Sequence, residues 1–125
     1  YRAGQAGGRV GRRAPALEAL LRGWGAREAA FLTAWNPWGR PRGDAANARA
    51  HARLLGETRR LRRATGWCGT REWRELTLLL AADPRRIATL ARRHRQAAVV
   101  HLRLGCALRL AYSPRFASKP RPAAR

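Results

Sequence analysis

The sequence predicts a single-domain α/β or α+β sandwich with a mixed sheet. Two observations support this fold class. Apolar residues recur at helical spacing in some segments and form short continuous or alternating runs in others. Gly, Pro, Asn and Asp separate these segments. The expected element order is (β)αβαβαββ. A length of 125 residues accommodates one such domain.

Three regions follow from this organisation. Residues 1–13 form a basic Gly/Arg-rich arm or a short first strand around Arg9–Gly11. Residues 14–112 form the α/β domain. Residues 113–125 form a Pro/Arg-rich basic tail that we expect to be disordered or ordered only against a partner, because it has no apolar pattern for burial.

The first half of the domain contains a helix, a strand, a loop and a longer helix. The segment APALEALLRGWG predicts a short amphipathic helix, with Pro15 in its first turn. Ala29–Trp35 predicts a strand buried on both faces, and Asn36–Gly43 predicts a loop. Asp44 is the expected N-cap of a helix that continues to about Arg62. Its inward-facing residues are Ala50, Leu54, Thr58 and Leu61.

The second half begins with a turn over Thr65–Arg71, followed by a strong strand over Glu72–Ala81. Asp83-Pro84 then starts a helix whose inner side carries Ile87, Leu90 and Ala91. Gln96 ends this helix. The segments AAVVHLRL and CALRLAY predict two strands joined at Gly105 as a hairpin.

The charge composition is strongly basic. The chain has 27 Lys and Arg residues against 7 Asp and Glu, a net charge of +20, and 26 of the basic residues (27 minus Lys119) are arginines. Self-repulsion at this charge opposes compaction unless a polyanion neutralises it. Arginine suits phosphate through its planar fork of donors, so nucleic acid is the favoured partner and an anionic membrane surface is the next candidate. No apolar run approaches the ~20 residues of a membrane span.

The arginines gather on the outer faces of the second and third predicted helices and in the tail. Few acidic residues stand four positions away to pair with them, so their like charges destabilise the helices unless a partner binds. The expected RNA-contacting residues are Trp38, Arg40, Arg42, Arg49, Arg53, Arg59, Arg60, Arg62, Arg63, Arg85, Arg86, Arg92, Arg93, Arg95, Arg115, Lys119, Arg121 and Arg125. A solvated charged surface is the alternative meaning of this pattern.

Trp38 stands in the predicted loop between two arginines. An exposed indole there can stack on an unpaired base while Arg40 and Arg42 hold phosphates. The alternative is an indole folded back onto the sheet. Trp24, Trp35 and Trp73 lie in apolar segments and are expected in the core, whereas Trp67 is undecided.

A set of polar residues stands at the predicted ends of strands and helices: Thr33, Asn36, Asn47, Glu75 and Gln96. Such ends often form ligand pockets. The alternative is a structural clasp, in which the two asparagines tie the Asn-Pro turn to the helix start and Glu75 pairs with an arginine. The sequence favours the clasp.

The chain resembles the bacterial family called domain of unknown function 3293. The resemblance rests on T-A-W-N-P (Thr33–Pro37), on Asn47, on W-x-E (Trp73 and Glu75), and on Gln96 followed by Ala-Val-Val. It extends from about Tyr1 to Tyr112 and implies a compact α/β domain with polar residues around the Asn-Pro turn. It implies no established activity, and the strong positive charge belongs to this chain rather than to the family.

Catalytic residues are not apparent in the sequence. His51, His94 and His101 lack the spacing of metal ligands, and serines occur only at Ser113 and Ser118, so no metal, cofactor or nucleophile–base pair is predicted. The sequence therefore favours a non-enzymatic RNA-binding protein, ribosomal or ribosome-associated, that contacts rRNA and neighbouring ribosomal proteins. The alternatives are a double-stranded DNA-binding protein and a small-molecule or nucleotide-binding enzyme that uses the polar set.

The two cysteines, Cys68 and Cys106, stand far apart and form no C-x-x-C motif. Two reduced thiols are typical of a bacterial cytoplasm or an organellar matrix, and we expect such a reducing compartment.

Overall fold

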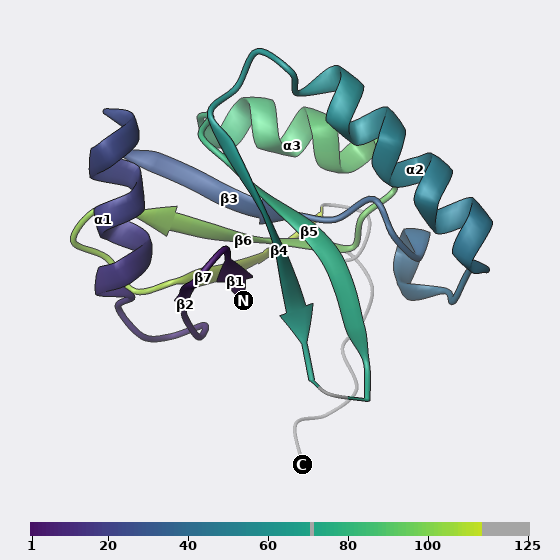
Figure 1. The fold of residues 1–125 in the computed structure, drawn as a ribbon, viewed down its shortest axis with the longest axis horizontal. Coiled ribbons are helices and arrows are strands. Elements are labelled where there is room, and N and C mark those ends of the chain that lie inside the picture. Colours follow the sequence, from purple (N-terminus) through teal and green to yellow (C-terminus); the bar gives the residue numbers. More distant parts are fainter. Residues whose placement is uncertain (71, 114–125) are drawn as a thin grey trace.

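The computed structural model describes residues 1–70 and 72–113, and it is an α+β domain (Figure 1). Its helices are α1 (Pro15–Trp24), α2 (Asp44–Glu57) and α3 (Pro84–Arg93), with a short 3₁₀ turn η1 (Pro37–Gly39). Its strands are β1 (Arg2–Ala3), β2 (Ala6–Gly7), β3 (Glu28–Leu32), β4 (Arg63–Gly69), β5 (Arg74–Leu80), β6 (Ala98–Arg103) and β7 (Arg109–Tyr112).

The seven strands form one sheet in the order β2-β1-β4-β5-β3-β6-β7. The expected mixed sheet is wrong, because every ladder between these strands is antiparallel. Within the described residues the parallel pairing is limited to an isolated bridge between Val10 and Leu108. Helices α2 and α3 do connect parallel strands, β3 to β4 and β5 to β6. Each such pair is separated by one inserted strand, so no parallel neighbours form.

The segment from β3 to β6 therefore has the βαββαβ order of a split βαβ unit. Both of its helices cover the same face of the sheet (Figure 1), where Leu54 and Ile87 pack on Leu78. Helix α1 covers part of the opposite face, where Leu17 packs with Phe31. The central strands are consequently buried on both sides near α1, as the apolar run of β3 predicted.

Strand β4 corrects two sequence expectations. The predicted turn over Thr65–Arg71 is mostly this strand, and the second helix ends at Glu57 rather than near Arg62. Gly66, which lies inside the predicted turn, is a point of close strand approach. A Cβ on Gly66 would lie 1.6 Å from the carbonyl oxygen of Arg2 in β1. A long-range pairing thus requires this glycine, and local sequence cannot reveal such a pairing.

Three further expectations need correction. The N-cap of α2 is Gly43, so Asp44 is the first helical residue and its carboxylate lies in the first turn. Trp73 is 49% exposed and is not in the core. The first strands are β1 and β2 rather than residues around Arg9–Gly11. In contrast, α1, α3 and the β6–β7 hairpin occupy their predicted positions.

A buried carboxylate connects α1 to the β6–β7 hairpin. Glu18 accepts hydrogen bonds from the Arg13 guanidinium at 2.9 and 3.2 Å and from the backbone N–H of Gly105 at 2.8 Å. Its side chain is fully buried in the structure. The hydrogen bonds from Arg13, and then that from Gly105, hold the pKa of Glu18 below its ordinary value of 4.5.

This arrangement predicts an acid-sensitive contribution to stability. Because the folded-state pKa of Glu18 is lower than the unfolded value, the contribution is complete above about pH 4.5 and is lost as the pH falls through the folded value. The free energy of unfolding should therefore decrease less steeply with acidification in Glu18→Gln than in the wild type. Urea melts between about pH 5 and pH 2 measure this, with exposed Glu72→Gln as the control. Equal slopes in all three proteins would contradict it.

Candidate functional site

The turn between β3 and α2 has an unusual backbone. Asn36 (φ 49°), Trp38 (φ 56°) and Gly39 (φ 73°) all adopt left-handed conformations. Asn and Gly tolerate this region, whereas Trp is rarely found there. Such a turn persists only when surrounding contacts fix it. One of these contacts is the hydrogen bond from the Trp38 N–H to the carbonyl of Arg95, at 2.7 Å.

A pair of buried asparagines fixes the turn. The backbone N–H of Asn36 donates to Asn47 Oδ1, and Asn47 Nδ2 donates back to Asn36 Oδ1, both at 3.1 Å. The backbone of Arg42 joins them: its N–H donates to Asn36 Oδ1 at 2.9 Å, and its carbonyl accepts from Asn47 Nδ2 at 3.3 Å. We call Asn36, Asn47 and the Arg42 backbone the asparagine clasp. It corresponds to the asparagine part of the clasp that the sequence favoured.

The other three predicted polar residues surround the clasp. Glu75 accepts a hydrogen bond from Asn36 Nδ2 at 2.9 Å. Thr33 Oγ1 donates to the carbonyl of Leu76 at 2.7 Å, which joins the end of β3 to β5. Gln96 donates through Nε2 to the carbonyls of Trp35 and His94, both at 3.1 Å. The structure thus brings all five residues together. The expected Glu75–arginine pair is absent among residues 1–70 and 72–113, where the ion pairs involve Glu18 and Glu57.

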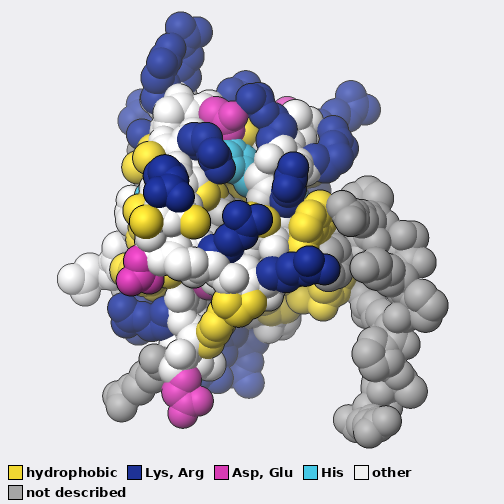
Figure 2. All heavy atoms as spheres, turned by 90° about the vertical axis from the view of Figure 1, so that its right-hand side faces the viewer, with side chains coloured by type: hydrophobic (Ala, Val, Ile, Leu, Met, Phe, Trp, Pro, Cys, Tyr) yellow, Lys and Arg dark blue, Asp and Glu magenta, His cyan; other side chains and the backbone are white. Residues whose placement is uncertain are grey.

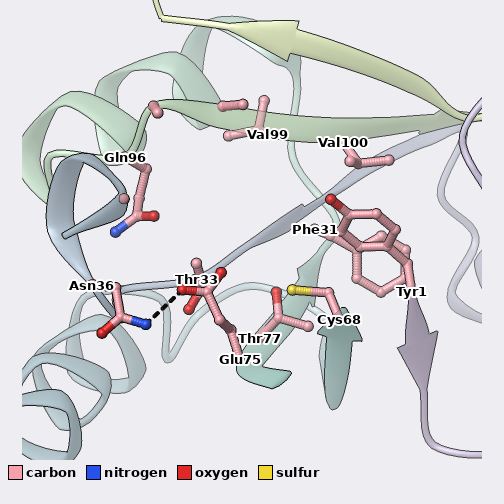
Figure 3. A pocket seen from close by; sticks show the side chains of 13 residues that line it. Tyr1, Phe31, Thr33, Asn36, Cys68, Glu75, Thr77, Gln96, Val99 and Val100 are labelled. Carbon is pink, nitrogen blue, oxygen red and sulfur yellow. Dashed lines mark hydrogen bonds between the residues drawn. The ribbon is translucent and has the colours of Figure 1, made fainter. Parts of the chain in front are cut away.

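A pocket of about 180 Å³ opens beside the clasp (Figure 3). Phe31, Val99 and Val100 give it an apolar side, and Thr33, Glu75 and Gln96 give it a polar side. It lies on the side of β3 that carries Phe31, and therefore on the sheet face opposite α2 and α3.

Three lining residues with polar side chains were missed from the sequence: Tyr1, Cys68 and Thr77. Cys68 lies directly opposite Glu75 in the β4–β5 ladder, and Thr77 lies opposite Gly66. Burial, and then the charge of Glu75, raises the pKa of Cys68 to about 11. Burial likewise raises the pKa of Tyr1 to about 12. Both side chains therefore remain protonated at neutral pH. Their position depends on β4, which the sequence did not predict.

On the opposite face of the sheet, a second cavity of about 450 Å³ lies between α2 and α3. We call it the arginine groove, and its lining includes His94 and the charged residues Arg42, Arg53, Glu57, Arg93 and Arg95. Glu57 is already engaged, because it pairs with Arg93 at 2.8 Å and with His94. In the described parts of the chain, no ion pair involves the other three arginines of the groove. The groove therefore carries excess positive charge.

The outer faces of α2 and α3 extend this basic surface (Figure 2). Arginine side chains far outnumber carboxylates on the face shown. The exposed predicted residues are Arg40, Arg42, Arg49, Arg53, Arg59, Arg60, Arg62, Arg85, Arg86, Arg92, Arg93 and Arg95. Arg115, Lys119, Arg121 and Arg125 lie outside the described residues.

Two of the predicted RNA-contacting residues are less accessible than expected. Arg63 is half-buried and donates hydrogen bonds to the Leu55 carbonyl and to Thr58 Oγ1, so it caps the C-terminal end of α2. Trp38 is half-buried in the turn. The exposed indoles are instead Trp67 and Trp73, which stand near the β4–β5 turn. Arg74 lies over the Trp67 ring at 4.7 Å from its centroid.

The histidines occupy separate structural positions. His94 is buried against Glu57, and burial lowers the pKa of both His51 and His101. No three His, Cys, Asp or Glu side chains converge to hold a metal ion in residues 1–70 and 72–113. In the same residues, no helix has the length and apolarity needed to cross a membrane.

A comparison with protein families matches residues 32–99 to the family described as "Protein of unknown function (DUF3293)". Since the match covers more than half of the chain, this protein belongs to that family. The matched segment begins at the end of β3 and ends in β6. It does not include residues 1–31 and 100–112, over which we expected the resemblance to extend. All five residues of the polar set lie within it. No curated protein and no solved structure matches the chain.

The asparagine clasp predicts that truncating the Asn47 side chain strongly lowers the free energy of unfolding. Asn47→Ala removes three hydrogen bonds and leaves the buried N–H of Asn36 without its acceptor. The free energy of unfolding should fall by about 2–3 kcal/mol. Arg49→Ala, on the exposed side of the same helix, should change it by less than about 0.5 kcal/mol. Denaturant melts of both variants test this, and equal effects would show that the clasp does not stabilise the fold.

Proposed function

We propose that this protein is a non-enzymatic RNA-binding protein whose principal contact surface is the arginine groove. The observation that supports the proposal is the convergence of Arg42, Arg53 and Arg95 on one cavity without acidic partners in the described residues. Guanidinium groups at a concave surface can hold successive phosphates of a folded backbone. Recognition is then by backbone and shape rather than by a sequence motif.

The local structure explains why these arginines converge. Arg42 is fixed through its backbone by the asparagine clasp. Arg95 follows α3 with a left-handed backbone (φ 53°), and its carbonyl accepts from Trp38, so the end of α3 is joined to the turn. Arg53 projects from α2 into the same space. A fixed backbone reduces the conformational entropy that phosphate binding must overcome.

RNA is favoured over duplex DNA by the exposed indoles. Trp67 and Trp73 are 39% and 49% exposed. An exposed indole can stack on an unpaired base, which loops and bulges of RNA supply and a regular duplex does not. Helices α2 and α3 also lie along the sheet with a groove between them, so the contact surface is concave rather than a single projecting recognition helix.

The arginine groove predicts that the salt dependence of RNA binding arises mainly from the arginines that line it. Arg53→Ala and Arg95→Ala should each weaken binding to an RNA hairpin and reduce the log–log salt slope by about one unit. The matched control is Arg27→Ala, which removes the same charge next to the first residue of β3, at the end opposite the turn. At 0.15 M salt the screening length is about 8 Å, so Arg27→Ala should change the slope little. Fluorescence anisotropy over a salt series measures all three slopes.

Two results would contradict the proposal. If all three variants lose equal slope, binding is spread over the whole charged surface rather than the groove. If a duplex DNA of equal length binds more tightly than the hairpin, the protein is a DNA-binding protein.

A ribosomal location is the more specific form of the proposal, because rRNA offers crevices that suit a small, strongly basic domain. The untagged protein should sediment with ribosomal particles at physiological salt and dissociate at high salt. If the protein stays at the top of the gradient and still binds RNA, its partner is an RNA other than rRNA.

A further inference from the structure

The pocket beside the asparagine clasp presents hydrogen-bond acceptors. Gln96 is only 5% exposed, and its Nε2 group donates to two backbone carbonyls. Its remaining polar atom, Oε1, is directed toward the pocket in Figure 3. Since an amide oxygen can only accept, a molecule that binds against Gln96 must present an N–H or O–H donor there.

Glu75 strengthens this requirement. One of its oxygens accepts a single hydrogen bond from Asn36. A carboxylate has about four acceptor sites, so Glu75, which lines the pocket, keeps most of its accepting capacity for a bound molecule or solvent. No ion pair of Glu75 exists within the described residues, although arginines are abundant in the chain. A ligand with two neighbouring N–H donors would satisfy this carboxylate in bidentate form.

The other side of the pocket suits a flat ring. Phe31 and Tyr1 stand with their ring centroids 5.3 Å apart, and Val99 and Val100 continue the apolar surface. A volume of about 180 Å³ equals that of about six liquid water molecules, which is the scale of one small planar group. RNA-binding modules commonly read unpaired bases on a sheet surface with aromatic side chains.

The charge of the whole protein restricts the ligand further. A small free cation has the donors that Glu75 requires, but it is repelled by a net charge of +20. A nucleotide avoids this conflict, because its phosphates are attracted to the arginines while its base carries the donors. The pocket and the basic surface are joined at the turn: Gly39 lines the pocket, and exposed Arg40 follows it in the chain.

We propose that this pocket binds the Watson–Crick edge of an unpaired guanine, with Glu75 accepting from N1–H and from the N2 amino group. Guanine is the common base with two adjacent donors on that edge. Adenine and cytosine place an acceptor nitrogen beside their amino group, and uracil places carbonyls on both sides of its N–H, so each would set an acceptor against the carboxylate. This assignment rests on the proposed RNA-binding function and adds a base preference to it.

The test compares two single-stranded RNAs that differ at one position, guanine in one and inosine in the other. Inosine keeps N1–H and lacks the N2 amino group. The wild-type protein should bind the guanine RNA about tenfold or more tightly, the effect of one hydrogen bond to a charged acceptor. In Glu75→Gln the preference should disappear while the salt slope is unchanged. Because this variant carries more net positive charge, weaker binding cannot arise from overall electrostatics.

The outcomes separate the two proposals. If wild-type protein binds both RNAs equally with a steep salt slope, RNA binding stands and the guanine site is wrong. If neither RNA binds at physiological salt, the proposed function is wrong, and titration with 5′-GMP against 5′-AMP then tests the pocket alone. Preference for GMP that is lost in Glu75→Gln supports a guanine nucleotide site, and equal or no binding overturns it. A thermal melt confirms that Glu75→Gln is folded.

Discussion

The hydrogen-bonded pair of Asn36 and Asn47 is the constraint on which the rest of this structure depends. It joins the end of the central strand β3 to the first turns of α2 and holds a backbone that would otherwise be strained. The Asn36 amide also bonds Glu75, which sets the wall of the pocket. The Arg42 backbone bonds both asparagines, which sets one edge of the arginine groove. One clasp therefore positions two surfaces on opposite faces of the sheet.

Three of the seven acidic residues of the chain hold structural partners and leave most arginines unneutralised. Glu18 holds Arg13 and the Gly105 backbone, Glu57 holds Arg93 and His94, and Asp83 caps α3 through the Arg86 N–H. These carboxylates stabilise local geometry and neutralise only a few cations. The excess charge then opposes compaction in the isolated protein, and a polyanion would remove that opposition. If the proposed RNA binding holds, stability and binding are coupled through the same arginines.

Much of the fold could be predicted from the sequence because its signals are local. Helices α1 and α3 have clear apolar periodicity with proline in the first turn, and β3 is a continuous apolar run. The polar set around the Asn-Pro turn was also predicted, since its members stand at element ends. Strand β4 was missed because Gly66 reflects a contact with β1, which lies more than 60 residues away. The pocket residue Cys68, which lies in β4, was missed for the same reason.

The arginine groove could not have been predicted as one site. It requires α2 and α3 to lie on the same face, and this follows from the strand order rather than from either helix alone. The most direct test of the account is an NMR titration of the labelled protein with an RNA hairpin at physiological salt. Backbone amide signals of residues 36–42, of α2 around Arg53 and of residues 94–96 should shift together. Shifts confined to α1 and β7, with none at the turn, would contradict it.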